Sequence, residues 1–596
     1  MARFAPMLAL AAGLMTAAPL PAQDVQFRLT TEDAGLRGTL RLASLTAELA
    51  AEGTGTPQDI VAAAQADYRR MLTGLYAEGY YGGAVSILID GREAAGLAPL
   101  DAPATIGSVE IRVTPGPRFR FGQAEIGPLA PGTTLPEGFR PGAVARSDMA
   151  RAAAIAAVDG WRDAGHAKAT PDSQDITAVH AENRLDVSIG IDPGPRLTFG
   201  PLIPSGNVAV RSERIVEIAG LPEGTVFSPE EVSLAAQRLR RTGAFSAVTL
   251  TEAENYTADY SLPITAQLAE EKPRRFGFGL EYSTVEGLGL SGYWMHRNLF
   301  GGAENLRVEA DISGLGGETG GTDYRLSADF RRPGTLHPDN DLLIGASIER
   351  LDEPDFFLDQ IALEAGFARR VSAQRTASGA IGFVAATVED DLGSRSYQLL
   401  TLPLTGTEDR RDDPLDPASG FYLSLDITPF LGFGDAGSGA RIYADGRAYR
   451  SFGADDRVTL AFRGQLGSVL GTGLSDSPSD YLFYSGGGDT VRGQPYQSLA
   501  IDLGGGNEIG GLSFAAASVE ARVSVTDRIG LVGFYDAGFV GDTATPFDSG
   551  DWHAGAGVGI RYNTGLGPIR VDLATPVTGP DAGDSLSFYV GIGQAF

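Results

Sequence analysis

The sequence predicts three small α+β modules followed by an antiparallel transmembrane β-barrel of about sixteen strands. Three features predict this fold class: an apolar N-terminal segment, a repeated pattern in the first half, and a long alternation of apolar and polar residues in the second half. The chain of 596 residues exceeds the usual size of one compact domain, so several folding units are expected. This combination is typical of an exported protein that crosses a membrane with strands.

Residues 1–22 have the features of a secretory signal. Arg3 provides the positive charge at the start, residues 7–18 form the apolar stretch, and Leu20-Pro21-Ala22 form the cleavage site. A buried core helix is the alternative, but two prolines near the end of the segment disfavour a helix. The segment therefore predicts export from the cytoplasm.

A repeat marks the first half of the chain. A Pro-Arg pair begins at positions 117, 195 and 273, at a constant spacing of 78 residues. Each pair follows a strand-like alternation, and a helix that ends at a glycine precedes each strand. The glycines are Gly79, Gly165 and Gly243, and the strands are 109–113, 185–189 and 264–268. The repeat predicts α+β modules at residues 23–117, 118–195 and 196–273, each ending in an edge-capable strand that can pair with an extended peptide.

Residues 274–596 are predicted to form the barrel. Apolar and polar residues alternate in many segments of this region, for example at 306–311, 324–331 and 458–463. Such alternation turns apolar side chains toward lipid and charged side chains toward a wet lumen. A soluble β-sandwich alternates in the same way, but the lack of helical signals over this length and the apolar face at its end favour the barrel. That final face comprises Phe588, Val590, Ile592 and Phe596.

The composition excludes several classes of function. The chain has no cysteine, which excludes disulfides and thiolate chemistry, and its net charge of −28 disfavours nucleic acid as a partner. Its five histidines lack the spacing of metal ligands, and the glycine run 486–488 lacks the Lys-Ser/Thr of a phosphate-binding loop. The acidic segment 409–416 departs from the spacing of a calcium loop, so a solvated turn is expected. We expect no catalytic residue, no metal site, no cofactor and no enzymatic activity.

Residues 484–493 end in Val491-Arg492-Gly493, and residues 533–538 read Gly-Phe-Tyr-Asp-Ala-Gly. These motifs resemble the outer-membrane insertase superfamily, in which POTRA (polypeptide-transport-associated) modules precede a barrel. The first motif resembles the family's loop six, and the second resembles the lumenal strand motif that receives the loop-six arginine. One difference is that Gln494-Pro495 follow Arg-Gly here, where the family usually has an aromatic residue.

Further segments extend the resemblance. Residues 567–574 match the penultimate strand, residues 409–420 match another segment of the family, and Phe596 matches the signal by which barrels are recognised for insertion. Three modules make the chain similar to the TamA branch of the superfamily. Five modules would be typical of the general barrel-assembly protein, and two of a two-partner secretion transporter.

Arg492 is the residue that the sequence singles out. A guanidinium inside a barrel needs a planar anionic partner, and Asp536 can accept it bidentately. Glu520 faces the lumen by strand parity and is a possible second acceptor. Together with Val491 and Gly493, these residues are predicted to lock the loop at about residues 472–510 inside the barrel. The alternative is that Arg492 lies at a solvated loop tip, where an ion pair contributes little.

A second predicted site is the seam between the first and the last barrel strands. The first strand contains Gly277 and Gly279, and the last contains Gly591 and Gly593. Glycine weakens strands, so the seam is predicted to open laterally and to expose backbone groups that template a client strand. The alternative is that these glycines only make room for side chains in the lumen.

The resemblance implies an outer-membrane factor of a Gram-negative bacterium, with its modules in the periplasm. It implies insertion or assembly of autotransporter-type barrel proteins, with unfolded outer-membrane clients, membrane lipid and a TamB-like inner-membrane-anchored protein as partners. A two-partner-type secretion pore for one dedicated polypeptide is the alternative. A passive porin, which has no need of the modules, is a third possibility.

Overall fold

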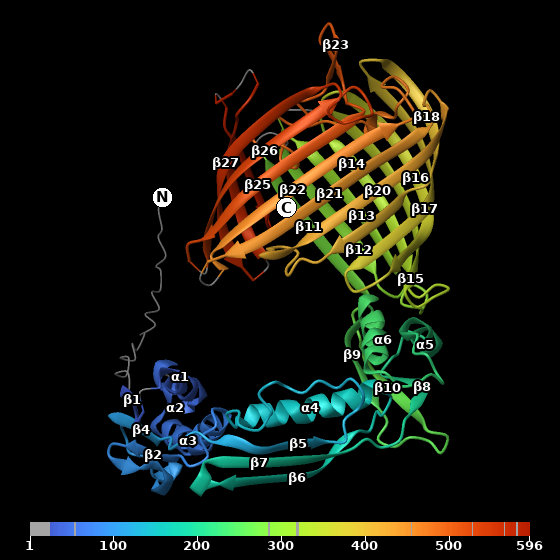
Figure 1. Cartoon of the computed structure of the whole chain (residues 1–596). Coiled ribbons are helices and arrows are strands. Elements are labelled where there is room, and N and C mark those ends of the chain that lie inside the picture. The colour runs from blue at the N-terminus through green and yellow to red at the C-terminus, as the bar shows by residue number, and fades with distance from the viewer. Residues whose placement is uncertain are drawn as a thin grey trace, which may run out of the picture. The chain divides into compact units, whose positions relative to one another are not determined.

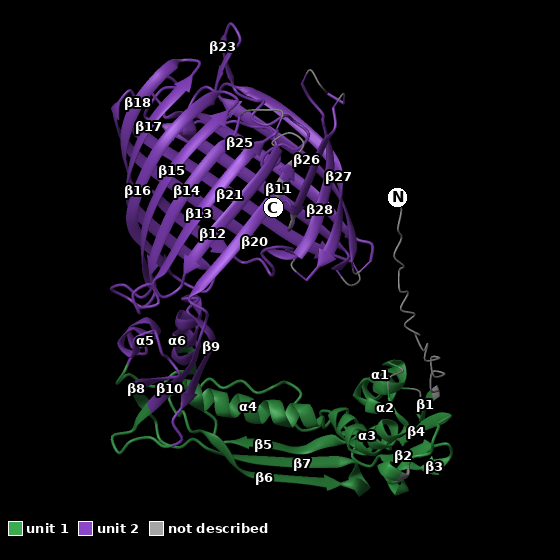
Figure 2. Cartoon of the chain, turned by 180° about the vertical axis from the view of Figure 1, so that it is seen from behind, with its two compact units in different colours: residues 1–200, 223–230, 255–262 green, residues 201–222, 231–254, 263–596 purple. Residues whose placement is uncertain are grey.

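The structure of the chain is a computed structural model that describes residues 24–31, 33–52, 55–283, 287–317, 321–453, 456–526, 528–565, 567–579, 582–583 and 585–596. The predicted secretory signal at residues 1–22 lies outside the described residues. Two compact units make up the chain (Figure 2); they comprise residues 1–200, 223–230 and 255–262, and residues 201–222, 231–254 and 263–596.

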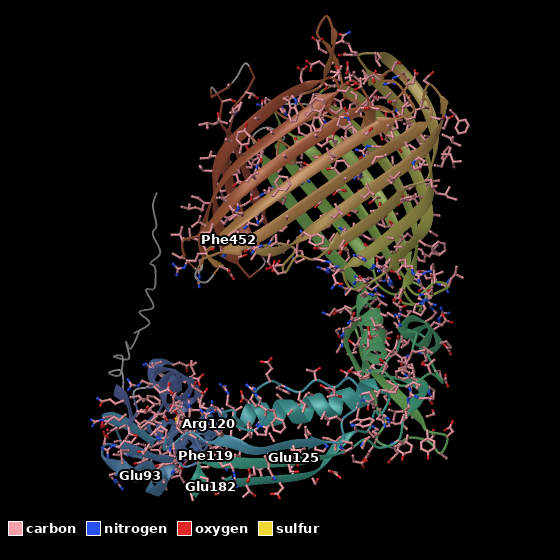
Figure 3. All side chains as sticks on the ribbon, in the orientation of Figure 1. Glu93, Phe119, Arg120, Glu125, Glu182 and Phe452 are labelled. Carbon is pink, nitrogen blue, oxygen red and sulfur yellow. The ribbon has the colours of Figure 1, made fainter. Side chains whose placement is uncertain are left out.

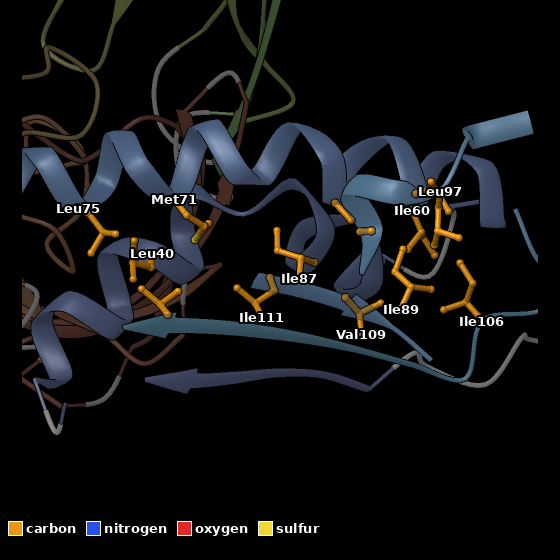
Figure 4. Packing of buried hydrophobic residues seen from close by; sticks show 14 of the residues in the cluster. Leu40, Ile60, Met71, Leu75, Ile87, Ile89, Leu97, Ile106, Val109 and Ile111 are labelled. Atoms are coloured by element: carbon orange, nitrogen blue, oxygen red, sulfur yellow. The ribbon is translucent and has the colours of Figure 1, made fainter. Parts of the chain in front are cut away.

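The first small sheet has the strand order β1-β4-β2-β3. Its elements are β1 (Asp24–Leu29), α1 (Ala34–Ala43), α2 (Leu45–Glu52), α3 (Pro57–Ala77), β2 (Ala84–Ile89), β3 (Arg92–Glu93), the 3-10 helices η1 (Ala94–Gly96) and η2 (Pro99–Asp101), and β4 (Ser108–Thr114). Figure 4 shows Met71 of α3 on the side of Ile87 and Ile111 of the sheet and Ile60 of the same helix near Ile89, and all five are buried. Apolar residues on one face of a long helix therefore form the core of this module with alternate residues of two strands.

The second small sheet has the order β5-β7-β6. Its elements are β5 (Arg120–Gly127), α4 (Ser147–Asp163), β6 (Thr170–Val179), η3 (His180–Glu182) and β7 (Arg184–Asp192). Phe119, labelled in Figure 3, joins this sheet to the first one. Its ring packs edge-on against Tyr81 at 5.5 Å, and its N–H donates to the carbonyl of Gly79 at 2.8 Å. The first and second sheets thus follow each other without a linker.

The third small sheet has the order β8-β10-β9 and lies largely in the second unit. Its elements are β8 (Thr198–Ser205), α5 (Ser212–Ala219), α6 (Pro229–Arg241), β9 (Phe245–Glu252) and β10 (Ser261–Glu270).

The strand that ends each repeat is central in its sheet. β4, β7 and β10 each lie between two other strands. The expectation that these strands are edge-capable is therefore wrong, and the reason is that β1, β5 and β8 precede the helices and cover the other side. The exposed edges belong to other strands, such as β6, whose residues 170–177 are all exposed.

The barrel is a closed sheet of seventeen strands (Figure 1). They are β11 (Arg274–Ser283), β12 (Gly287–His296), β13 (Asn305–Leu315), β14 (Asp323–Arg332), β15 (Asn340–Glu353), β16 (Phe356–Arg370), β17 (Arg375–Asp390), β18 (Gly393–Thr401), β19 (Leu404–Asp409), β20 (Ser419–Gly434), β21 (Gly439–Phe452), β22 (Val458–Leu470), β25 (Ser513–Ser524), β26 (Ile529–Gly541), β27 (Asp551–Thr564), β28 (Gly567–Pro576) and β29 (Ser587–Ile592). Sequence analysis predicts about sixteen. The difference arises because β18 and β19 both pair with β17 and β20, and Pro403 separates them.

The barrel wall has an apolar outside and a polar inside. In β26, Leu531 and Tyr535 are about half exposed on the outer face, whereas Asp536 is fully buried on the inner face. The same alternation occurs in β25, where Val519 is exposed and Glu520 is buried. Alternation of this kind is expected for strands between lipid and a filled lumen. Among the described helices, none is both long and apolar enough to span a membrane.

One end of the lumen holds a large cluster of buried apolar side chains. The buried side chains of this cluster come from the ends of strands β16 to β18, β20, β22, β25 and β26 and from the segment between β22 and β25. They include Phe356, Leu358, Val388, Leu399, Phe430, Leu482, Phe483 and Phe514. The expectation of a wet lumen therefore fails at this end, because the chain between β22 and β25 fills it with apolar side chains.

The third small module is fastened to the barrel within the second unit. Arg238 of α6 donates through Nε and Nη2 to the carboxylate of Asp339 at 2.8 Å each, in the turn between β14 and β15. Arg214 of α5 is buried and donates to the carbonyl of Pro333 at 2.6 Å. The hydrogen bonds from Arg238 lower the pKa of the Asp339 carboxyl below its usual value, although partial burial opposes this shift.

Candidate functional site

Residues 471–512, which connect β22 to β25, are called loop six below. They contain the 3-10 helix η5 (Ser479–Tyr481) and the hairpin of β23 (Ile501–Gly504) and β24 (Asn507–Ile509). The loop returns along the lumen wall, and its residues Leu482 and Phe483 belong to the apolar cluster. The segment 491–494, which is entirely buried, continues into a charged part of the lumen. Loop six is thus anchored by apolar contacts at one level and by charges at another.

Arg492 lies at the centre of the charged part, with a side chain only 4% exposed. It meets Asp536 bidentately, from Nε to Oδ2 at 2.8 Å and from Nη2 to Oδ1 at 3.0 Å. Nη1 donates to Glu520 Oε1 at 2.7 Å, and the guanidinium lies 3.5 Å from the centroid of the Phe534 ring. The structure therefore brings together Arg492, Asp536 and Glu520 and places none of them at a solvated loop tip.

The two neighbours of Arg492 also contact the wall. Val491 is fully buried. Gly493 has φ +95°, and a Cβ there would come within 2.6 Å of the backbone of Thr575 in β28. Its N–H donates to the hydroxyl of Tyr589 in β29 at 3.1 Å. Only glycine fits this position, because the backbone of loop six approaches the backbone of the barrel.

Sequence reasoning missed further members of this network. Asp572 of β28 lies 3.5 Å from Nη1 of Arg492 and also pairs with buried Arg561 of β27. Arg522 of β25 donates from Nε to Glu520 Oε2 at 2.9 Å. Three arginines (492, 522 and 561) thus face three carboxylates (520, 536 and 572), all buried. Removing one member of such a set leaves a charge without its partner, and this costs more than the pair contributes when intact.

A carboxylate flanked by two lipid-facing residues is a signal that could have identified Asp572. Asp572 stands between Val571 and Leu573, so strand parity requires it to face the lumen. The same argument places Tyr589, between Phe588 and Val590, on the lumenal face.

Gln494 occupies a place where the family usually has an aromatic residue. Its side chain is buried, and Nε2 donates to the carbonyls of Ala554 at 2.8 Å and Thr578 at 3.0 Å. These bonds hold loop six to the start of β27 and to the segment after β28. Gln494 thus adds two hydrogen bonds between loop six and the backbone of the barrel.

The seam between β11 and β29 is the shortest ladder in the barrel wall that the structure describes. β11 pairs with β12 over ten residues but with β29 only at Tyr282↔Val590 and Ser283↔Tyr589. On the outer face of β11, Phe276 is 64%, Phe278 89% and Leu280 74% exposed. Much of β11 thus has a partner on one side only.

The glycines of the seam lie where side chains of neighbouring strands pass. A Cβ at Gly277 would come within 2.2 Å of the Tyr293 ring, and one at Gly279 within 2.3 Å of Ser291 Oγ. A Cβ at Gly591 would lie 2.8 Å from Nε of Arg570. Gly593 has φ +90° and lies beyond the end of β29. Three of these glycines therefore make room for side chains, and the fourth turns the chain out of the sheet.

The four residues predicted to share the final apolar face do not all do so. Phe588 and Val590 are half-buried members of β29, and Ile592 is its last residue. Phe596 has left the strand, is only 7% exposed, and packs with Tyr449 and Ala461. The inclusion of Phe596 in that face is wrong, because the turn at Gly593 sends the chain across the lumen.

These features define a class of protein: a membrane β-barrel with an apolar exterior, a lumenal loop held by a buried arginine, and a weakly paired seam. The chain belongs to the Omp85 superfamily, because the model described as "Omp85 superfamily domain" matches residues 298–596. Its location in the outer membrane and its resemblance to the insertase superfamily are thereby confirmed.

Individual relatives agree with this placement. The chain is 25% identical over 463 residues to the outer membrane protein assembly factor BamA of Nitratidesulfovibrio vulgaris. The matched region covers 74% of this chain and 56% of that relative. It thus spans little more than half the length of that protein.

Solved structures show the same fold at low identity. BamA from Haemophilus ducreyi lacking POTRA domains 1-3 has a TM-score of 0.62 at 17% identity, over 79% of this chain and 100% of that one. CdiB from Acinetobacter baumannii has a TM-score of 0.52 at 12% identity, over 80% of this chain and 90% of that one.

Proposed function

We propose that the chain is a TamA-like factor that inserts barrel proteins into the outer membrane by strand pairing at the β11–β29 seam. The observation that carries this proposal is the ladder of two residue pairs at the seam, beside ten between β11 and β12. An unpaired strand edge presents N–H and C=O groups that another extended chain can satisfy. Inside lipid, these groups have no water as an alternative partner, so pairing with a client strand is strongly favoured.

The proposed reaction needs neither a cofactor nor a covalent intermediate. A client strand first pairs with the free side of β11, and further client strands then add to it as hairpins. Exposed Phe276, Phe278 and Leu280 give this edge an outer face that matches the lipid core. The energy comes from backbone pairing and from transfer of apolar client side chains into lipid.

The loop-six contacts support a role as a lock. Arg492 connects loop six to β25, β26 and β28, and Gly493 connects it to β29. We propose that Val491, Arg492, Gly493, Asp536 and Glu520 keep the last strands of the barrel in place when the seam opens. The seam then changes shape without unfolding of the wall behind it.

The three small sheets are proposed to belong to POTRA modules at residues 23–117, 118–195 and 196–273, located in the periplasm. The barrel has sixteen strands if β18 and β19 are counted as one interrupted strand. The exposed edge of β6 suits binding of an extended client by β-augmentation. Autotransporter-type clients and a TamB-like inner-membrane-anchored partner follow from the TamA resemblance.

A two-partner-type secretion pore is the second candidate, and the likeness to CdiB is the observation in its favour. A secretion pore needs a path through the lumen. The apolar cluster around Phe430, Phe483 and Phe514 fills one end of the lumen and favours the insertase.

A disulfide across the seam tests the proposal. The chain has no cysteine, so the double variant Y282C/V590C contains the only thiols. We expect the oxidised variant to lose insertion of a barrel client into liposomes and to regain it on reduction. The matched control is L326C/I348C, at exposed paired positions of β14 and β15 in the wall, which should insert equally well in both states. Full insertion by the oxidised seam variant contradicts the proposal.

A further inference from the structure

A groove of about 620 Å³ crosses the lipid-facing side of the barrel wall between β20 and β27. Its floor consists of Gly446 of β21, Gly464 of β22 and Ala517 of β25, which pair with one another in a single row across the strands. β21, β22 and β25 are neighbours in the wall (Figure 1), so the row is continuous. Leu423 beside Gly446 and Phe462 beside Gly464 are each 49% exposed, so this row faces outward.

The floor is hollow because its residues have small side chains or none. The atom nearest to a Cβ added at Gly446 would be Leu423 Cδ1 at 3.7 Å, and at Gly464 it would be Phe462 Cε1 at 3.4 Å. Neighbouring side chains therefore leave the space above both glycines open. Gly277 of β11 differs, because the ring of Tyr293 already occupies the space beside it.

Aromatic side chains form one wall of the groove. Trp552 of β27 stacks on Phe547 of the β26–β27 loop at 5.5 Å, and both rings pack on Phe539 of β26. Phe547 keeps a positive φ of 71°, which is unfavourable for a bulky residue, and its ring is more than half exposed. The hydroxyl of Ser468 on β22 donates to the carbonyl of Ala544 at 2.6 Å and fastens this loop to the outer wall. The loop thus holds an exposed ring beside the groove.

Arginines stand at the opposite end of the groove. The guanidinium of Arg410 lies 5.8 Å from the ring centroid of Phe421, which lines the groove. Arg450 is exposed and continues the outward row of β21 beyond Gly446. Phe452, two residues further along β21, lies at the lower edge of the barrel in Figure 3. This is the edge at which β11 begins and the third small module joins the barrel.

These arginines can accept an anion. Arg410 and Arg375 share one carboxylate, that of Glu408. No carboxylate among the described residues forms an ion pair with Arg450. The nearby Asp412 instead uses Oδ1 to accept backbone N–H groups of its own turn. Arginine suits a phosphate group in particular, because its planar N–H donors match two phosphate oxygens.

The other end of the groove is acidic. In and beside the β26–β27 loop, Asp542, Asp548 and Asp551 are exposed, and residues 538–560 contain no lysine or arginine. A negatively charged group is therefore repelled at the loop and attracted at Arg410 and Arg450. The charges thus give the groove a direction.

The groove has the dimensions of one hydrocarbon chain. Neighbouring strands lie about 4.8 Å apart, so the four steps from β20 to β26 cover about 19 Å. Outward residues of one strand lie about 7 Å apart, so the rows that flank the floor leave width for a single chain. Half of the hydrocarbon core of a bilayer is about 15 Å thick, so a tilted chain from one leaflet fits along the floor.

We infer that the groove binds one phospholipid of the periplasm-facing leaflet, with an acyl chain along its floor and the phosphate at Arg410 and Arg450. Apolar character alone does not distinguish the groove from the rest of the wall, because lipid tails are as apolar as leucine. The preference comes from packing in the hollow and from the charge-assisted contacts of the phosphate. The site belongs to strands β20 to β27 and does not rest on the proposed function of the seam.

Quenching of tryptophan fluorescence in the full-length protein in detergent micelles tests the site. The chain has three tryptophans, so W161F/W294F leaves Trp552 beside the groove as the only reporter. The probe is phosphatidylglycerol with brominated acyl chains, which quenches tryptophan on contact. The matched reporter is W161F/W552F, because Trp294 lies on the outer face of β12, away from the groove. We expect quenching of Trp552 to saturate, with its midpoint at a mole fraction of probe about tenfold lower than for Trp294.

Filling the floor tests where the chain lies. Gly464→Leu should shift the midpoint for Trp552 close to that for Trp294, because the leucine side chain occupies the hollow. Gly533→Leu is the matched control: it lies on the outer face of β26 outside the groove, and no atom lies within 4 Å of its Cβ. This control should leave the midpoint unchanged.

Removal of the arginines tests where the phosphate lies. R410Q/R450Q should raise the midpoint for Trp552 about threefold, because charge-assisted contacts are lost. R350Q is the matched control, since it removes an exposed arginine of β15 that belongs to another part of the wall. It should have no effect on the midpoint.

Three results overturn the inference, provided that each variant remains a heat-modifiable barrel. Quenching of Trp552 in proportion to the mole fraction of probe, as expected for Trp294, shows that the groove has no preference for lipid. A midpoint that Gly464→Leu leaves unchanged shows that the chain does not lie on the floor. A midpoint that R410Q/R450Q leaves unchanged removes the phosphate contacts, and with them a phospholipid as the occupant.

Discussion

The seam and the wall of the barrel are held together in different ways. β15 and β16 pair continuously from Asn340↔Arg369 to Glu353↔Phe356, whereas β11 and β29 pair at two positions. Next to the seam, the last strands are instead connected by side chains of loop six, with Arg492 reaching β25, β26 and β28. The wall thus depends on its backbone ladder, and the region beside the seam depends on buried charges. A barrel can therefore have a weak edge without losing its shape.

The largest expected effect is a loss of stability that differs between a variant beside the seam and a variant in the wall. Asp536→Asn removes the bidentate partner of buried Arg492, and we expect the free energy of unfolding to fall by about 3 kcal/mol. Glu349→Gln in the wall removes the partner of Arg325, whose side chain is 54% exposed, and should cost at most about 1 kcal/mol. Thermal unfolding in micelles measures both. Equal losses in the two variants contradict the difference between seam and wall.

The close approach of loop six to β28 predicts the next effect. Gly493→Ala places a Cβ against the backbone of Thr575 at a positive φ, and we expect a loss of about 2 kcal/mol and faster proteolysis of loop six. Gly504→Ala is the matched control, since its φ is +86° but no atom lies within 4 Å of its Cβ. If both variants lose equal stability, conformational strain alone explains the effect and the contact with β28 is unimportant.

Tyr589→Phe tests whether loop six holds the last strand, β29, at the seam. It removes the hydroxyl that accepts the N–H of Gly493, and we expect a loss of about 1 kcal/mol with faster hydrogen exchange at Gly493. Tyr562→Phe in β27, where the side chain is 46% exposed on the outer face, should change neither quantity. A Tyr589 variant with unaltered exchange would show that loop six does not hold β29.

The smallest effect concerns the turn between β14 and β15, where Asp339 binds Arg238 of α6. The pKa of Asp339 is lowered mainly by hydrogen bonds from Arg238, so its carboxylate stabilises the folded state above the ordinary pKa of 3.8 and this contribution disappears as pH falls through the lowered value. We expect hydrogen exchange in α6 to be constant from neutral pH down to about 4, after correction for the intrinsic rate, and to rise below it. Asp339→Asn should abolish that acid-dependent step. If the Asp339→Asn variant shows an acid-dependent rise in exchange of equal size, then groups other than Asp339 cause that rise.

Local patterns explain what the sequence predicted correctly. A period of two residues identified the barrel strands, because each strand lies between lipid and lumen. Parity also placed Glu520 on the lumenal face, and the motif at 533–538 pointed to the contact between Asp536 and Arg492 that the structure contains. The helix-ending glycines Gly79, Gly165 and Gly243 all have positive φ, as their position predicted.

Contacts between distant segments explain the rest. The burial of Phe596 depends on Tyr449 and Arg522, and nothing in residues 593–596 themselves indicates that the chain turns inward. The central position of β4, β7 and β10 depends on strands that precede each helix. The apolar cluster in the lumen is likewise misread by alternation, because Val388 faces inward although its exposed neighbours Thr387 and Glu389 are polar.

The filled end of the lumen bears on how the protein would act in the membrane. Side chains of loop six and of the barrel wall pack together there, so this end of the lumen is filled with protein. In the proposed mechanism a client strand enters the bilayer sideways at the seam, and this entry does not require an open channel through the filled end.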